Sequence, residues 1–294
     1  MSRMIEHPYG NLTGGKWVKG NFHTHTTASD GERPHQEVID DYAGRDYGFL
    51  MISDHDIFTS AEDYARFDSR GLILIPGNEI SARGPDLLHV GAKALTPPHA
   101  DRQRVIDATA EDGGFIIVNH PNWGRDFNHC PQEMLENWQG YIGLEIYNGV
   151  ISRLFGSPYA TNRWDMLLSK GRRLWGFAND DSHKSQGDVG LGWNCVYTKD
   201  ATTEGVLEAL AGGRFYTSTG VEILSIRVEG YRIDIQTKNA VRIVALHDHG
   251  QRFDWIEANS ISTEAPREAT YVRFECWGKG EAFAWTQPFF VDSR

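Results

Sequence analysis

Short apolar segments alternate with longer polar segments over the first two-thirds of the chain. We predict strands at residues 17–22, 48–53, 72–76, 87–92, 115–119, 143–148, 174–179 and 194–198. The strongest of them, such as "FIIV" and "LILI", are almost continuously apolar, which is typical of strands that are covered on both faces. None approaches the roughly 20 residues that a membrane-spanning helix needs.

The segments between these strands carry the signals of helices. "RPHQEVIDDYAGRD" has Pro34 near its first turn, and "SAEDYARFDSRG" offers Ser60 as an N-cap. "HADRQRVIDATAEDGG" and "TTEGVLEALAGG" end in glycine, a common stop signal, and residues 152–171 predict one longer helix. Repeated strand–helix units indicate a parallel α/β architecture, and their number favours a closed or nearly closed barrel.

The pattern changes after "GGRFYTSTG". Segments such as "EILSIRVEG", "YRIDIQT" and "TYVRFECWG" alternate apolar and polar residues, turn residues separate them, and no helix is indicated. This pattern predicts a small antiparallel β-sandwich. We therefore expect two domains, a barrel over residues 1–219 and an accessory sandwich over residues 220–294.

Composition narrows the class of protein. The 294 residues carry a net charge of −11, from 29 basic and 40 acidic residues, which argues against an extended nucleic acid as the partner. A small anionic substrate remains compatible, because bound metal ions can outweigh the global charge. Cys130, Cys195 and Cys276 are scattered and predict no disulfide framework. With no apolar leader or membrane segment, we expect a soluble, cytoplasmic protein.

Nine histidines and carboxylates stand out, because most of them follow a predicted strand directly. They are His23, His25, Asp30, His55, Glu79, His89, His120, Asp181 and His183. The carboxyl ends of the strands in a parallel barrel share one rim, so these side chains are expected to converge there. His89 fits less well, since it lies inside "LLHV". The other histidines, which fall outside this pattern, are His7, His35, His99, His129, His247 and His249.

Imidazole and carboxylate together suit divalent ions such as Zn²⁺, Mn²⁺ and Fe²⁺. Nine such groups exceed the needs of one ion and match two or three ions that share a bridging carboxylate. Each motif alone has an ordinary structural interpretation: an H-x-H pair on the surface, a hydrogen-bonded core histidine for His89, or a helix-capping aspartate in "SDHD". Their joint placement after successive strands favours a metal cluster.

The ordered motifs "FHTHTTASDG", "ISDHD", "GNEI…LLHVGA", "VNHP" and "ANDDSH" resemble those of the polymerase and histidinol phosphatase (PHP) superfamily, over roughly residues 17–219. The resemblance implies a distorted (β/α)7 barrel and three ligand sets. The first ion would be held by His23, His25, Glu79 and Asp181. A second would be held by Glu79, as a bridge, with His89 and His120. A third would be held by Asp30, His55 and His183. Many members have histidine in place of Asp30, so the number of ions, two or three, stays open.

The implied reaction is hydrolysis of a phosphate ester by a metal-bridging hydroxide, with Glu79 and Asp181 as the catalytic carboxylates. Small phosphorylated substrates fit: a nucleotide, a sugar phosphate, a cyclic phosphodiester or the end of an oligonucleotide. Arg83, Arg125 and Lys184 lie near the motifs and are the candidates for binding the phosphate. No nucleophile elbow, CxxC pattern or glycine-rich phosphate loop is present in the sequence.

Two alternatives remain at this point. A related metal-dependent hydrolase of the amidohydrolase type would cut a C–N or C–O bond with the same ligands. A non-enzymatic, metal-stabilised scaffold would use the site for structure and the sandwich for binding a partner. The second is disfavoured, because a purely structural site is closed by four ligands and leaves no open position.

Overall fold

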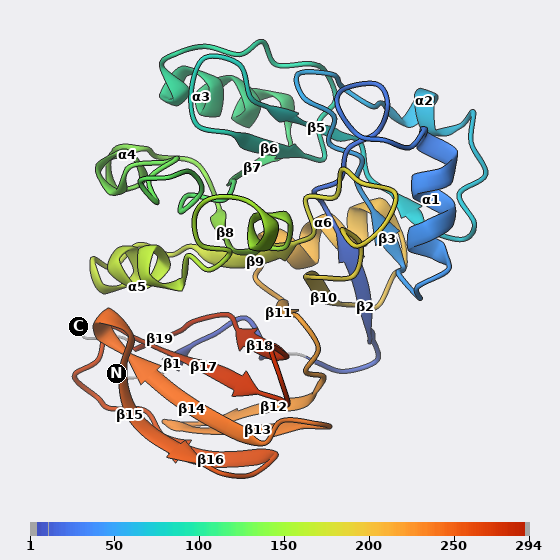
Figure 1. Cartoon of the computed structure of the whole chain (residues 1–294). Coiled ribbons are helices and arrows are strands. Elements are labelled where there is room, and N and C mark those ends of the chain that lie inside the picture. The colour runs from blue at the N-terminus through green and yellow to red at the C-terminus, as the bar shows by residue number, and fades with distance from the viewer. Residues whose placement is uncertain (1–4, 11, 292–294) are drawn as a thin grey trace.

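The computed structural model describes residues 5–10 and 12–291. An α/β part and an all-β part are stacked on each other (Figure 1), and the first and last described residues, Ile5 and Val291, pair with each other in the all-β part. Among the described residues, no helix combines the length and the apolar character required to cross a lipid bilayer.

Two sheets form the α/β part. The first contains β2 (Lys16–Asn21), β3 (Phe49–Leu50) and β4 (Ile73–Leu74), which are parallel, and β10 (Trp193–Thr198), which is antiparallel to β2. The second contains β5 (Gly77–Ile80), β6 (Leu87–Val90), β7 (Phe115–Val118), β8 (Gly143–Asn148) and β9 (Trp175–Asn179). Within it β5, β6 and β7 run antiparallel, whereas β7, β8 and β9 run parallel.

The α/β prediction is confirmed, but continuous strand pairing does not close these sheets into the predicted barrel within residues 5–10 and 12–291. Instead, isolated bridges join Thr24 to Ser182 and His55 to Glu79. Apolar side chains from both sheets, among them Phe49 and Phe177, pack into one core. With only two residues each, β3 and β4 offer too few ladder hydrogen bonds to continue the ring.

Helices flank the sheets. They are α1 (His35–Ala43), α2 (Ala61–Tyr64), α3 (Arg102–Asp112), α4 (Gln132–Asn137), α5 (Thr161–Ser169) and α6 (Thr203–Ala211), with 3₁₀ turns η1 (Val150–Arg153) and η2 (Asp248–Gly250). Ser60 caps α2 as predicted and forms a capping box with Asp63. The single helix predicted over residues 152–171 is wrong. Gly156, at φ +117°, and Pro158 separate η1 from α5.

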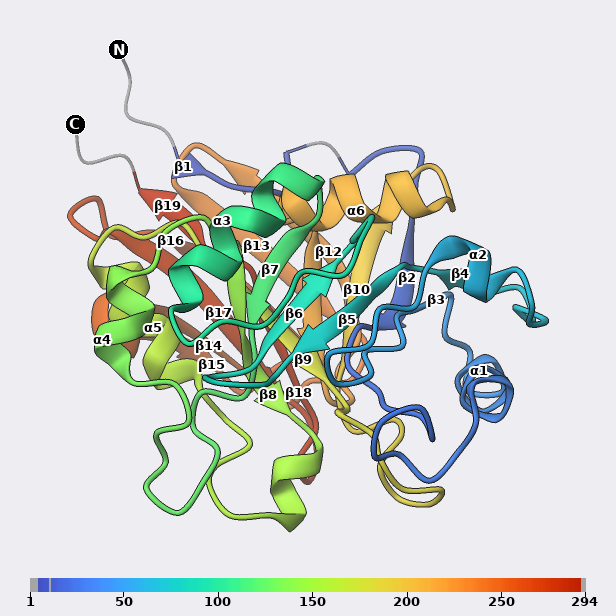
Figure 2. The same ribbon diagram turned by 90° about the horizontal axis from the view of Figure 1, so that it is seen from above.

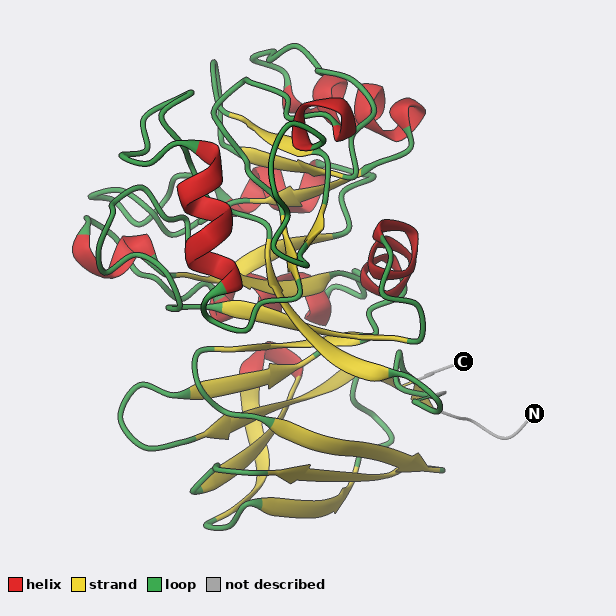
Figure 3. Cartoon of the chain, turned by 90° about the vertical axis from the view of Figure 1, so that its right-hand side faces the viewer, coloured by secondary structure: helices red, strands yellow, loops and turns green. Residues whose placement is uncertain are grey.

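The all-β part has two layers (Figure 3). One is the antiparallel sheet of β12 (Ile223–Glu229), β13 (Arg232–Thr237) and β16 (Ser260–Glu264). The other contains β1 (Ile5–Glu6), β11 (Phe215–Ser218), β14 (Arg242–His247), β15 (Gln251–Ile256), β17 (Tyr271–Trp277), β18 (Phe283–Thr286) and β19 (Phe289–Val291). A shared core, including Ile235 and Phe274, lies between them. The antiparallel C-terminal sheet is thereby confirmed.

One sheet runs through both parts of the molecule. β10 pairs with β11, β11 pairs with β18, and β1 pairs with β19. The N-terminal strand therefore belongs to the C-terminal layer, and the domain boundary at residue 220 stays a prediction. A buried ion pair adds a second connection, because Arg273 of β17 contacts Asp165 of α5 at 2.7 Å.

Candidate metal centre

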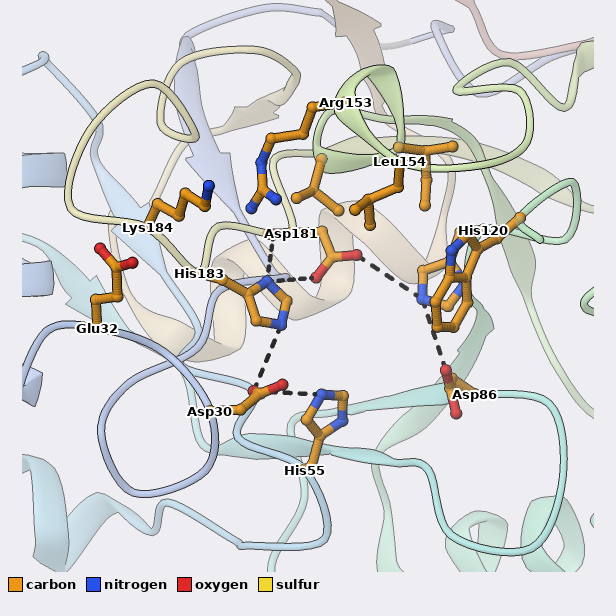
Figure 4. A pocket seen from close by; sticks show the side chains of 13 residues that line it. Asp30, Glu32, His55, Asp86, His120, Arg153, Leu154, Asp181, His183 and Lys184 are labelled. Carbon is orange, nitrogen blue, oxygen red and sulfur yellow. Dashed lines mark hydrogen bonds and ion pairs between the residues drawn. The ribbon is translucent and has the colours of Figure 1, made fainter. Parts of the chain in front are cut away.

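Loops at the ends of several strands gather on one side of the molecule, at the bottom of the view in Figure 2. They carry three overlapping groups whose possible ligand atoms lie within 4.8 Å of one another: His23, His25 and Asp181; His23, Glu79 and His120; and His25, Asp30, His55 and His183. The structure thus brings together every residue of the predicted set except His89. Figure 4 shows several of these side chains around a common cavity.

The innermost group is buried and compact. Nε2 of His23 lies 3.2 Å from Oε1 of Glu79 and 3.2 Å from Oδ1 of Asp181. Nε2 of His25 lies 3.2 Å from the same Asp181 oxygen and 3.5 Å from Oε2 of Glu79. Two imidazoles therefore face two carboxylates, as in a site for a borderline divalent ion.

Several polar atoms of this group have no hydrogen-bond partner although they are buried. They are Nε2 of His23 and both ring nitrogens of His25. An unsatisfied buried polar group costs about 1–3 kcal/mol, and such groups are rare in native proteins. Nε2 of His23 and Nε2 of His25 face the same oxygen of Asp181, and a divalent cation bound there would satisfy both nitrogens.

The loop after β2 is held in place by backbone and carboxylate contacts. The buried carboxylate of Asp54 accepts hydrogen bonds from the backbone N–H of Thr26, at 2.8 Å, and from the hydroxyl of Ser29, at 2.6 Å. The N–H of Asp181 donates to the carbonyl of His23 at 2.9 Å. Asp181 adopts the left-handed conformation, at φ +56°, which is uncommon outside glycine and occurs at functional sites.

A second layer of contacts orients the imidazoles. Nδ1–H of His23 donates to the Glu145 carboxylate at 2.8 Å, and Nδ1–H of His183 donates to the carbonyl of Asp181 at 2.9 Å. Each contact leaves Nε2 as the free nitrogen, which is the usual arrangement for metal-binding histidines. Glu145 also accepts from side-chain amides of Asn148 and Asn179. Glu145 was missed by the sequence analysis because it lies within β8, not after it.

Replacing Glu145 with Gln should lower the affinity for the first metal ion about 10- to 100-fold. The amide keeps the volume but loses the negative charge that fixes the His23 tautomer. Titration of the metal-free protein with Zn²⁺ against a competing chelator measures the effect. Glu133→Gln, on the exposed surface of α4, is the matched control. Equal affinities in both variants would show that Glu145 has no orienting role.

His89 does not join the cluster, which corrects its assignment as a ligand. It is paired with Asn78 across β5 and β6, whereas Glu79 is paired with Leu88. Because side chains alternate between the two faces of a strand, His89 points to the face opposite Glu79. Its Nε2 lies 3.8 Å from Asp112 of α3, and burial lowers its pKa to about 4.

Two residues that the sequence analysis did not select, Asp86 and His129, lie beside His120 instead. Asp86, His120 and His129 form a fourth group with possible ligand atoms within 4.8 Å. Nε2 of His129 is 3.1 Å from Oδ2 of Asp86, and Nε2 of His120 is 3.7 Å from the same oxygen. Asp86 precedes its strand and His129 lies in a long loop, so neither shows the strand-end signal used for the other residues.

The carboxylates raise the pKa of the histidines around them. Burial alone would lower the pKa of His55 and His120. The hydrogen bonds and negative charge of Glu79 outweigh burial and raise each pKa to about 9. Burial alone would raise the pKa of Asp181. Its contacts with His23 and His25 outweigh burial and hold this pKa well below the usual range. In the metal-free protein the cluster therefore holds protons between its carboxylates.

Metal affinity should therefore rise between about pH 6.5 and pH 9. His55 and His120, with a pKa of about 9 in the metal-free state, are protonated at neutral pH and must release their protons when an ion binds. Calorimetric titration with Zn²⁺ in two buffers of different ionisation enthalpy measures this release. Binding heats that do not depend on the buffer, with a constant affinity over this range, would contradict the prediction.

The cavity beside the cluster has a volume of about 350 Å³, the size expected for a small ligand. Lys184 is among the residues that line it, and Arg83 and Arg125 are not. A cation that sequence analysis missed, Arg153 of η1, lines the cavity as well. It pairs with Asp188, whose carboxylate also accepts the N–H of Lys184.

The protein is a mixed α/β protein, and its His, Asp and Glu clusters could hold more than one metal ion. Among solved structures, a two-domain protein from Bacteroides vulgatus containing a predicted PHP-like metal-dependent phosphoesterase matches 99% of this chain and 91% of its own, with 16% identity and a TM-score of 0.59. The lesion-specific endonuclease PfuEndoQ from Pyrococcus furiosus matches over 67% of this chain and 56% of its own, with 14% identity and a TM-score of 0.50.

Neither a family model nor a curated protein matches the sequence. The motifs of the sequence resemble those of the PHP superfamily, and the fold confirms this resemblance. The similarity to a PHP-like structure extends over nearly the whole chain. The His, Asp and Glu groups are consistent with a multinuclear metal site.

Proposed function

We propose that this protein is a metal-dependent phosphoesterase that hydrolyses a small phosphate ester. One observation carries the proposal: the buried and unpartnered Nε2 atoms of His23 and His25 each lie 3.2 Å from Oδ1 of Asp181, and Asp181 lines a cavity together with Lys184. Such a site presents positive charge and open coordination positions once ions are bound. The PHP-like fold supports the same reading.

The chain supplies two ligand sets of different accessibility. His23, His25, Glu79 and Asp181 would hold one ion in the interior. Asp30, His55 and His183 would hold another at the rim, where the Asp30 side chain is 57% exposed. We therefore propose two or three ions, of Zn²⁺, Mn²⁺ or Fe²⁺, with the outer one exchanging more readily. When bound, such ions supply Lewis acidity and lower the pKa of water to about 7.

The remaining side chains bind and orient the substrate. Lys184 is placed to neutralise a phosphate oxygen, and Arg153 holds the loop of Lys184 in position through Asp188. Glu79 lies between the inner and outer ligand sets, 2.8 Å from His55 and 3.2 Å from His23. It is therefore the carboxylate best placed to bridge two ions.

Phosphate release tests the proposal. Protein loaded with Mn²⁺, Zn²⁺ or Fe²⁺ should hydrolyse phosphomonoesters or phosphodiesters, chelation should abolish the activity, and His23→Ala should not recover it when metal is added back. His99→Ala, a half-buried histidine outside the cluster, is the control. Hydrolysis of amides or lactones without phosphate release would favour the amidohydrolase alternative. Bound metal without any hydrolysis would favour the scaffold.

A further inference from the structure

One wall of the cavity is apolar. It is formed by side chains of Trp123, Val150, Ile151 and Leu154. Figure 4 shows Leu154 on the opposite side of the cavity from Asp30 and His55. A metal cluster needs no apolar wall to bind a phosphate, so this surface requires a separate explanation.

The apolar surface continues outside the cavity. The side chains of Leu154, Phe155 and Phe127 are 44%, 58% and 53% exposed. These are the only exposed phenylalanines among residues 5–10 and 12–291, and both lie in loops that adjoin the cavity wall. Large apolar side chains gathered at the mouth of a pocket mark a ligand-binding surface, because leaving them in water is unfavourable.

Backbone contacts hold the loops of this wall in place. Trp123 and Gly156 form a β-bridge, and the N–H of Gly124 donates to the carbonyl of Phe155 at 3.0 Å. The N–H of Leu154 donates to the carbonyl of Ile151 at 3.0 Å. Arg125 lies over the Phe155 ring at 3.9 Å. Binding of a ligand group at this wall therefore costs little free energy for ordering the protein.

We infer that the substrate carries a planar, apolar group, such as a single aromatic ring, next to its phosphate. The phosphate lies at the metal ligands and Lys184, and the ring lies against Leu154 and Trp123. A cavity of about 350 Å³ accommodates a group of this size beside a phosphate. The inference rests on the proposed function, since the phosphate position is taken from it.

Binding of two non-hydrolysable phosphonates to the Mn²⁺-loaded protein tests the inference. Phenylphosphonate and methylphosphonate share the charged group and differ in the ring. Calorimetry should give a dissociation constant about tenfold lower for phenylphosphonate. In Leu154→Ser this ratio should fall to about threefold or less. Leu224→Ser is the matched control, because Leu224 is 47% exposed in β12 and far along the chain from the cavity.

If the wild-type protein binds the two phosphonates with equal affinity, the inference is overturned, and no variant is needed to reach that conclusion. A ratio that stays at tenfold in Leu154→Ser, with an unchanged melting temperature, would overturn the assignment of the wall. If neither phosphonate binds although Mn²⁺ is bound, the proposed function fails, and the inference fails with it. These outcomes separate failure of the ring site from failure of the phosphate site.

Discussion

Asp181→Asn should lose the inner metal ion and lower kcat/KM for phosphate release by more than about 100-fold. Oδ1 of Asp181 lies 3.2 Å from Nε2 of both His23 and His25, so one carboxylate serves both histidines. The amide keeps the shape but removes the negative charge that two imidazoles and a cation require. Metal content by elemental analysis and phosphate release, measured on the same preparation, check both effects.

Asp107→Asn provides the comparison for this variant, because Asp107 lies exposed on α3, where it accepts a hydrogen bond from the side-chain amide of Gln103. It should retain the metal content and activity of the wild-type protein. Full metal occupancy and full activity in Asp181→Asn would show that the reaction takes place elsewhere. If Asp181→Asn loses its metal but the wild-type protein itself releases no phosphate, the result would instead favour a structural role for the cluster.

Asp165→Ala should lower the free energy of unfolding by about 3–5 kcal/mol. Asp165 accepts two hydrogen bonds from the Arg273 guanidinium, each 2.7 Å long, and one from the hydroxyl of Tyr271, also 2.7 Å long. Arg273 is 1% exposed. Its remaining ion pair, with Glu275, would not compensate for a buried charge that has lost its main partner. Urea unfolding followed by fluorescence measures the change.

An exposed ion pair on the same layer gives the control. Arg242 and Glu257 form a surface pair beside Trp255, and Glu257→Ala should cost less than about 1 kcal/mol. Because Asp165 belongs to α5 and Arg273 to β17, the buried pair connects the α/β part to the all-β part. A cost below about 1 kcal/mol for Asp165→Ala would mean that water reaches Arg273 and that the pair does not stabilise this contact.

Most helices and strands follow from local pattern. The strand predicted at residues 143–148 coincides with β8, and α3 and α6 fall inside the segments that end in glycine. β5 was missed, because "GNEI" has no apolar run although all four residues are buried. The single long helix predicted over residues 152–171 is wrong because Gly156 and Pro158 interrupt the segment between η1 and α5.

The sequence by itself determined which chemical groups are available and that most of them follow strands, and this was enough to predict a divalent metal site. Only the tertiary structure decided that His89 points away, because its direction depends on pairing with Asn78. It also brought Asp86 and His129 together with His120. These residues meet through loop paths and strand register, which are set by long-range packing and leave no local pattern in the chain.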